Sequence, residues 1–274
     1  MHNKARKWGQ KPTRPTDCPD PTRVLVAIPI FNECAHVDSV LRAVKGYAGS
    51  VLVVDDGSTD GTSELLKRHE DIEVLSHDNN IGYGQSLIDA FGFAESRGFD
   101  WVITLDCDHQ HQPSYLPSFY SQISDDGADI ISGSRYLRRL DLGSVRPPQE
   151  RILINKEITA LLNSRLSIGL TDAFCGFKAY RTESICSLGL SEKGYGLPLQ
   201  LWIKASRAGL RIREIPVPLI YHDPKRKFCG ILEDPKKRLA YYMQVIEGEF
   251  DHNVGRDSAD ILDSHRRRLH LHSP

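Results

Sequence analysis

Hydrophobic residues in the first half of the chain occur in short continuous runs separated by segments of helical spacing. The runs predict buried strands, and they lie at Val24–Ile28, Val51–Val54, Ile72–Leu75 and Trp101–Leu105. Between the first two runs, apolar residues recur at three- and four-residue intervals from Val37 to Val44. Strands that alternate with helices in this way predict βαβ units and a mostly parallel sheet.

The second half of the chain continues this pattern less regularly. A further strand is predicted from residue 128 into Arg135, and helices over residues 151–166 and 197–208. Residues 212–220 predict a strand at an edge of the sheet, because Pro216 and Pro218 have no N–H to donate to a neighbour. Residues 172–181 form a segment centred on a glycine, with aromatic residues beside cations.

The pattern predicts one α/β domain over residues 23–222 with an extension at each end. Residues 1–22 are basic and rich in proline, which is typical of a tail. Residues 223–274 form a C-terminal extension with the basic run Lys225-Arg226-Lys227 and an amphipathic stretch from Leu239 to Phe250.

Composition narrows the class of protein. The net charge of −1 over 274 residues gives no argument for a nucleic-acid partner. The six cysteines form no C-x-x-C pair and no secretory leader is evident, so we expect free thiols in a reducing compartment. No apolar run approaches the ~20 residues that span a bilayer. We therefore expect a cytoplasmic protein, unless another element holds it at a membrane.

Two carboxylates at the end of one predicted strand are the first candidate for chemistry. Asp106 and Asp108 follow the strand at i and i+2, so they face one point if the extended backbone persists through them. Paired carboxylates suit Mg²⁺ or Mn²⁺, which takes further ligands from water and substrate phosphates. Gln110 continues the alternation and can add a carbonyl oxygen. The alternative is a polar loop that caps the next helix.

Polar loops after the other strands favour a sugar nucleotide as ligand. Glu33 and the pair Asp55-Asp56 can accept hydrogen bonds from a base or ribose, whereas a G-x-G-x-x-G loop and a P-loop are both absent. In parallel sheets, ligands bind beyond the carboxyl ends of the strands, where these loops lie. A helix-capping turn explains Asp55, Ser58 and Asp60 equally well.

Several segments together resemble one family. They are Ala27–Glu33 (AIPIFNE), Val53–Gly61 (VVDDGSTDG), Asn79–Gly82 (NNIG), Asp106–Gln110 (DCDHQ) and Ile131–Tyr136 (ISGSRY). The set is similar to family 2 glycosyltransferases, which have the Rossmann-like GT-A fold, and the likeness runs from Val24 to Tyr221. Residues 172–181 (DAFCGFKAYR) and the pair Gly194-Tyr195 resemble, within that family, the dolichol-phosphate mannosyltransferase catalytic subunit and its bacterial polyprenyl-phosphate relatives.

The resemblance implies roles for individual residues. The nucleotide-sugar pocket would be lined by Pro29, Phe31, Asn32, Glu33, Val54, Asp56, Gly82 and Asp106. The metal, Mg²⁺ or Mn²⁺, would be held by Asp106, Asp108 and Gln110. Phosphates of donor or acceptor would be bound by Arg135, Arg151 and Lys178. Three places depart from the pattern, all on the acceptor side: Cys175, residues 197–200 and residues 223–228.

The implied activity is inverting, metal-dependent transfer of a hexose, mannose or glucose, from GDP-mannose or UDP-glucose to a polyprenyl or dolichyl phosphate. An acceptor phosphate is already an anion and needs no strong base, whereas a hydroxyl acceptor would, and Asp172 is then the candidate. The run Lys225-Arg226-Lys227 would give peripheral contact with the cytoplasmic face of an anionic membrane. Two alternatives stay open: a soluble hydroxyl acceptor, and a non-catalytic interaction subunit with the same fold.

Overall fold

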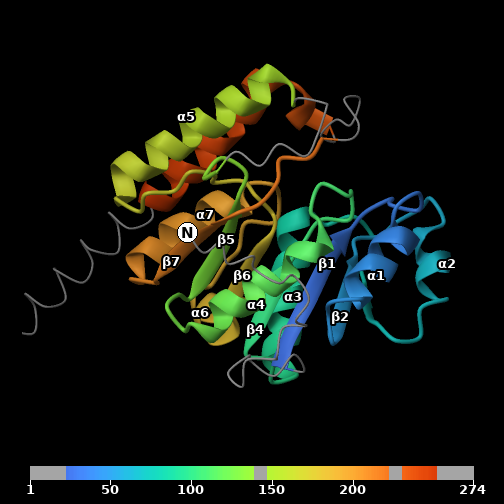
Figure 1. The fold of residues 1–274 in the computed structure, drawn as a ribbon. Helices are drawn as coiled ribbons and strands as arrows, with labels where there is room; N and C mark the ends of the chain where they lie inside the picture. The colour runs from blue at the N-terminus through green and yellow to red at the C-terminus, as the bar shows by residue number, and fades with distance from the viewer. Residues whose placement is uncertain (1–22, 139–146, 222–229, 252–274) are drawn as a thin grey trace, which may run out of the picture.

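The computed structural model describes residues 23–138, 147–221 and 230–251 (Figure 1). Within them, seven strands form one sheet in the order β3-β2-β1-β4-β6-β5-β7. The strands are β1 Val24–Ile30, β2 Ser50–Asp55, β3 Glu73–Ser76, β4 Trp101–Thr104, β5 Ile130–Ser134, β6 Lys178–Arg181 and β7 Ile212–Pro216. The α/β prediction is confirmed, and the proline-bearing strand β7 lies at an edge of the sheet, as expected.

Helices connect the strands and cover the sheet. They are α1 Val37–Lys45, α2 Thr62–Leu66, α3 Tyr83–Ser96, α4 Leu116–Ser124, α5 Gln149–Leu166, α6 Thr182–Ser187 and α7 Leu197–Arg207. Two 3₁₀ turns, η2 Pro113–Tyr115 and η3 Gly230–Glu233, precede α4 and a last helix of residues 235–251, which we call the C-terminal helix. No helix in the described ranges is long and apolar enough to cross a membrane.

The segment of residues 172–181 contains a strand that the sequence pattern did not reveal. Its last four residues form β6, which is antiparallel to both β4 and β5. The other pairings are parallel, so the sheet is mostly parallel, as predicted. Because β6 runs the opposite way, its amino end lies at the edge of the sheet where β4 and β5 have their carboxyl ends. Gly176 and the residues around it therefore reach the edge where the predicted site lies.

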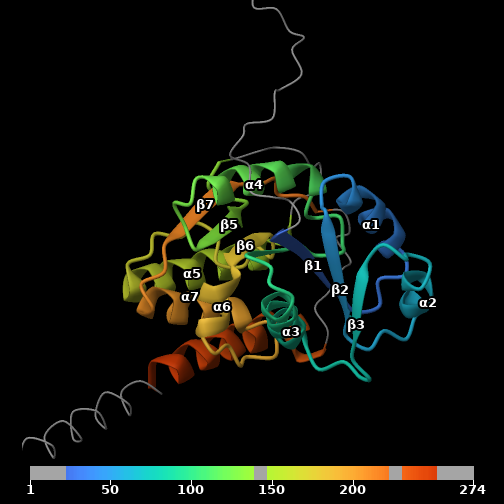
Figure 2. The same cartoon turned by 90° about the horizontal axis from the view of Figure 1, so that it is seen from below.

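The core has two layers, one on each face of the sheet. Alternate residues of β1 pack to opposite faces, Val26 and Ile28 into one cluster and Leu25 and Ala27 into the other. Helices α1, α2 and α4 cover the first face, and α3, α5, α6, α7 and the C-terminal helix cover the second (Figure 2). Both faces of the central strands are buried, which is why those strands are continuously apolar in sequence.

The C-terminal helix packs on the second layer of the core. Ile246 is fully buried there, and Arg165 of α5 forms a two-point ion pair with Glu247, with N–O distances of 3.0 and 2.8 Å. Gln200 of α7 donates to Glu249 at 2.6 Å. Part of the predicted extension, residues 235–251, thus lies against the α/β domain beside α5 (Figure 1). The tail of residues 1–22 and the basic run Lys225–Lys227 lie outside the described residues.

Candidate active site

A cavity of about 410 Å³ opens at the carboxyl ends of β1, β2, β4 and β5. Its wall contains residues from the loops after these strands and from α3, α5, α7 and the C-terminal helix. Predicted site residues in the wall are Pro29, Phe31, Glu33, Asp56, Gly82, Asp106, Asp108, Gln110, Arg135 and Arg151. The remaining four, Asn32, Val54, Asp172 and Lys178, do not belong to it.

Asp106 and Asp108 both line this cavity, but not by the geometry expected from the sequence. Strand β4 ends at Thr104, and the backbone bends through residues 107–111 instead of staying extended. The loop is held by its own polar groups: the Asp106 N–H donates to His111 Nδ1 at 2.9 Å, and the Gln110 N–H donates to Asp108 Oδ1 at 3.0 Å. The Tyr83 hydroxyl donates to Asp106 Oδ1 at 3.2 Å. A bent loop, rather than a strand, therefore brings both carboxylates to the cavity.

Gly176 makes room for the Asp106 carboxylate. A Cβ atom on Gly176 would lie 2.6 Å from Asp106 Oδ2, closer than any ordinary contact. The same segment is fixed to β4, because Thr104 Oγ1 donates to the Gly176 carbonyl at 2.7 Å. Gly176 thus leaves the space that the Asp106 carboxylate occupies after the neighbouring strand β4.

His111 is a structural part of the carboxylate loop. Burial lowers its pKa to about 4, so the ring is neutral at pH 7 and its Nδ1 accepts the Asp106 N–H. In the described part of the chain, no three side chains of the His, Cys, Asp and Glu types are grouped as a metal site. Two carboxylates and Gln110 nevertheless fit Mg²⁺ or Mn²⁺, since these ions take their remaining ligands from water and substrate phosphates.

Asp56 holds together the loops at the end of the cavity formed by β1 and β2. Its carboxylate is 3% exposed and accepts the N–H groups of Ile81 and Gly82, both at 2.9 Å. These bonds tie the loop after β2 to the amino end of α3. Gly82 has a φ of 118°, and a Cβ atom there would lie 2.3 Å from the Lys193 carbonyl oxygen. Only glycine therefore fits where the backbone at Gly82 meets the backbone at Lys193. The rings of Tyr83 and Tyr195 stack beside this contact, with their centroids 5.4 Å apart.

Other polar residues near this end are structural. Asp55 accepts hydrogen bonds from the Ser58 N–H at 3.0 Å and the Ser63 hydroxyl at 2.6 Å. Asp60 accepts the Thr62 N–H at 3.1 Å in the first turn of α2, so these residues shape the turn before the helix, but the N-cap position itself is Gly61, which has no side chain to form a cap. Asn32 accepts the Thr59 N–H at 2.8 Å and so joins the loops that follow β1 and β2.

Val54 points into the second core layer and is fully buried. The implied contacts of Asn32 and Val54 with the nucleotide are therefore not supported by where the structure places them.

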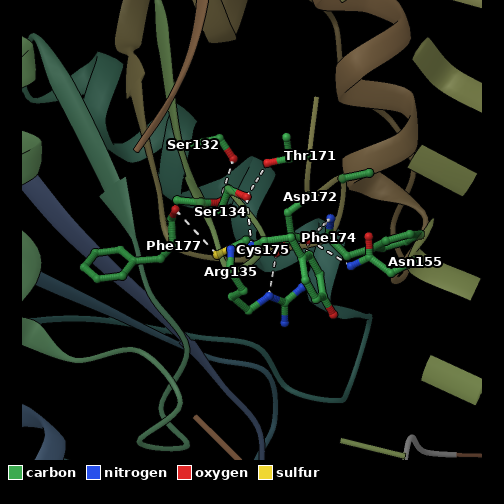
Figure 3. A network of polar contacts seen from close by, with 12 residues as sticks. Ser132, Ser134, Arg135, Asn155, Thr171, Asp172, Phe174, Cys175 and Phe177 are labelled. Atoms are coloured by element: carbon green, nitrogen blue, oxygen red, sulfur yellow. Dashed lines mark hydrogen bonds and ion pairs between the residues drawn. The ribbon is translucent and has the colours of Figure 1, made fainter. Parts of the chain in front are cut away.

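Arg135 and Asp172 form a buried ion pair at the other end of the cavity (Figure 3). Asp172 is fully buried and accepts two bonds from the guanidinium, at 2.6 and 2.9 Å, besides one from Asn155 at 2.9 Å. Burial acts to raise the Asp172 pKa, but the charge and hydrogen bonds of Arg135 outweigh it, and the pKa lies well below its usual range. A carboxylate held in this way cannot take a proton from a substrate. This corrects its candidacy as a base: Asp172 positions Arg135.

Lys178 also differs from its implied role. Its ammonium group is fully buried, donates to the Cys175 carbonyl and lies 5.4 Å from the Trp202 ring centroid. Burial lowers its pKa. Cys175 is buried as well, and burial raises its thiol pKa to about 11. Neither residue lines the cavity, which argues against direct phosphate binding by Lys178.

Several residues of the cavity wall were not predicted from the sequence. They are Asn80, Tyr83, Asn155, Phe174, Tyr195, Tyr221, Arg238 and Tyr242. Tyr195 and Tyr221 offered a signal, since Tyr195 lies in a recognised motif and Tyr221 directly follows a predicted strand. Arg238 offered none, because it ends the basic run Lys236-Lys237-Arg238, and such charge runs are typical of a solvated surface.

Sequence comparisons relate this chain to known proteins. The sequence model of "Glycosyl transferase family 2" matches residues 25–188. The chain is 32% identical over 208 residues to the undecaprenyl-phosphate mannosyltransferase of Micrococcus luteus, with 72% of this chain and 84% of the relative covered. It is 31% identical over 206 residues to the polyprenol monophosphomannose synthase of Mycolicibacterium smegmatis, covering 71% and 76%.

Solved structures establish the fold. The glucosyl-3-phosphoglycerate synthase of Mycobacterium tuberculosis, in complex with Mn²⁺, UDP-glucose and phosphoglyceric acid, superposes with a TM-score of 0.63. The sequences are 20% identical, and the match covers 82% of this chain and 79% of that one. Together with a family match over more than half of its length, this shows that the chain belongs to glycosyl transferase family 2 and is a glycosyltransferase with the GT-A fold.

Proposed function

We propose that this glycosyltransferase transfers a hexose, with mannose as the first candidate, from a nucleotide sugar to a polyprenyl phosphate with inversion at the anomeric carbon. One observation carries the proposal: nucleotide-type loops, paired carboxylates and guanidinium groups line a single cavity. The names of the two bacterial relatives, which are a mannosyltransferase and a phosphomannose synthase for polyprenyl substrates, support the same acceptor class.

The donor would bind at the end formed by β1 and β2. Glu33 and Asp56 face the cavity there beside Pro29 and Phe31, where they can accept hydrogen bonds from a base and ribose while the apolar residues pack on the base. Asp106, Asp108 and Gln110 would hold the metal ion next to this pocket. When bound, Mg²⁺ or Mn²⁺ would supply positive charge for the diphosphate as it leaves.

The acceptor would approach from the end that carries Arg135 and Arg151. Arg135 is fixed by Asp172, which Asn155 holds in turn, so the guanidinium is oriented before any substrate binds. Arg151 lies over the Tyr221 ring, 5.6 Å from its centroid, and lines the same cavity. Two oriented guanidinium groups suit a phosphate monoester, and such an anion attacks the sugar without a base.

A transfer assay tests the proposal. GDP-mannose and UDP-glucose would each be offered with Mn²⁺ or Mg²⁺ to a short-chain polyprenyl phosphate and to the matching polyprenol. We expect turnover with the phosphate alone, more with one donor than with the other, and a raised acceptor KM in Arg151→Ala. Equal use of the alcohol, or an unchanged acceptor KM in the variant, would refute the lipid-phosphate acceptor in favour of a hydroxyl acceptor.

We also propose that the protein meets its acceptor as a peripheral protein of a membrane surface. Polyprenyl phosphates are membrane lipids, and about 1 kcal/mol of attraction per basic residue near an anionic surface would give weak, salt-sensitive attachment. The basic run Lys225-Arg226-Lys227, between β7 and the C-terminal helix, is the proposed contact. Sedimentation with anionic vesicles at low and high salt would test it.

A further inference from the structure

The C-terminal helix brings a third guanidinium group, besides those of Arg135 and Arg151, to the acceptor end of the cavity. Arg238 lies in the first turn of this helix, is 3% exposed and lines the same cavity as Arg151 of α5. Tyr221, which follows β7, lines it too. These three residues come from three separate parts of the chain, so only the tertiary structure places them together.

The charges around Arg238 favour an anion in this space. Burial lowers the pKa of Arg238, Tyr242 acts in the opposite direction, and the positive charge of Arg151 lowers the pKa further. Of the acidic groups nearby, Glu150 is 42% exposed and lies 3.9 Å from Arg238 Nη2. Asp234 caps its own helix by accepting the N–H groups of residues 236 and 237 at 2.8 and 3.0 Å. A dianion between the two guanidinium groups would relieve their mutual repulsion.

Arg238 is oriented before a ligand binds. Its Nη1 donates to the Leu232 carbonyl of η3 at 3.0 Å, which fixes one edge of the guanidinium. The planar group has five N–H donors in a rigid arrangement, so anchoring one edge sets the direction of the others. Ordering the side chain in advance reduces the entropy that binding would otherwise cost.

The Tyr221 hydroxyl is a third polar group at this place. Its side chain is 5% exposed, and the hydroxyl has no hydrogen-bond partner among the described residues. Buried hydroxyl groups are usually paired, so an orphaned one beside a cavity indicates an acceptor that comes with the ligand. The ring packs against Arg151 and so holds that cation and the hydroxyl close together.

We propose that Arg238 and the Tyr221 hydroxyl bind the acceptor phosphate together with Arg151, so that the C-terminal helix is part of the acceptor site. The inference rests on the proposed function, because the ligand is taken to be the phosphate monoester of that reaction. The donor diphosphate has similar chemistry, so the two substrates must be distinguished by experiment. The fold gives the reason for the acceptor: Arg238 lies close enough to Arg151 of α5 for their charges to interact, whereas the donor loops follow β1 and β2.

Steady-state kinetics of three variants test the arginine. Arg238→Met removes the charge at similar length, Arg238→Lys restores one charge, and Lys237→Met removes an exposed charge from the adjacent position as a control. We expect Arg238→Met to raise the acceptor KM about ten- to a hundredfold, the usual effect of losing a hydrogen bond to a charged group, with kcat and donor KM changed less than about threefold. The lysine variant should recover part of the loss, and Lys237→Met should match the wild type.

Tyr221→Phe tests the site even if Arg238→Met fails to fold. Phenylalanine keeps the ring under Arg151 and removes only the orphaned hydroxyl, so the melting temperature should stay equal or rise. The acceptor KM should nevertheless increase severalfold. Thermal-shift titration with inorganic phosphate, without donor, gives a readout besides activity: phosphate should stabilise the wild type and Lys237→Met at lower concentrations than it stabilises Tyr221→Phe.

The outcomes separate the two proposals. If the wild type transfers no sugar to the lipid phosphate, the proposed function fails. If transfer occurs but Tyr221→Phe and both Arg238 variants keep the wild-type acceptor KM, only the present inference fails. An increase confined to the donor KM would assign the guanidinium to the diphosphate and also overturn it.

Discussion

Replacing Asp172 by asparagine should destabilise the fold strongly while leaving its shape almost unchanged. The substitution removes the negative charge that Arg135 faces across 2.6 and 2.9 Å, in a place where Asp172 is fully buried and the Arg135 side chain is 20% exposed. Removing one charge of a buried ion pair lowers the free energy of unfolding by about 3–5 kcal/mol, because the remaining charge is left uncompensated. Partial exposure of Arg135 favours the lower value, about 3 kcal/mol, or roughly 6–12 °C in melting temperature for a protein of this size.

Calorimetry or chemical denaturation measures this loss against a matched control. Asp100→Asn makes the same change in the Arg23–Asp100 pair, whose side chains are 60% and 45% exposed, and should cost about 0–1 kcal/mol. Adding Arg135→Met to Asp172→Asn should cost less than the two single changes together, since no charge is then stranded. A melting temperature of Asp172→Asn within about 2 °C of that of Asp100→Asn would show that Arg135 is not left as a stranded charge.

The pair also sets a dependence of stability on pH. The pKa of Asp172 is lower in the folded than in the unfolded state, so its stabilisation is complete above the ordinary carboxyl pKa of about 4. That stabilisation is lost as the pH falls through the lower folded pKa. The free energy of unfolding of Asp172→Asn should therefore fall less steeply with decreasing pH than that of the wild type.

The remaining predictions concern the carboxylate loop. Asp108→Asn should abolish sugar transfer at saturating Mn²⁺ with an unchanged melting curve, and wild-type turnover would refute the metal assignment. EDTA should weaken binding of GDP or UDP in calorimetry, whereas equal affinity without metal would contradict the proposed clamp. Gly176→Ala places a methyl group 2.6 Å from the Asp106 carboxylate and should reduce kcat/KM by about a hundredfold, with the fold retained by circular dichroism. Because folding lowers the pKa of His111 to about 4, its contribution to stability is complete above pH 6.5 and falls by about 3 kcal/mol as the pH falls to about 4. The free energy of unfolding of His111→Asn should depend less on pH over this range.

The sequence by itself determined the sheet's main strands and the types of residue in the site. Continuous apolar runs such as Val24–Ile28 are buried on both faces, and polar loops follow them because a parallel sheet gathers its carboxyl ends at one edge. Asp106, Asp108, Glu33 and Asp56 were found in this way. The motifs also identified the family, since their order along the chain is specific to it.

Only the tertiary structure decided which charged residues face the cavity. Asp172 and Lys178 appear in sequence as ordinary site candidates, but both are buried: Lys178 begins strand β6, which lies antiparallel between β4 and β5, and Asp172 pairs with Arg135. A strand of four residues is too short for its hydrophobic pattern to predict it from the sequence. Arg238 is the converse case, because a helix far along the chain folds back beside α5 and carries it into the wall. Burial and contact between distant segments arise from the packing of whole elements, and local sequence patterns do not record them.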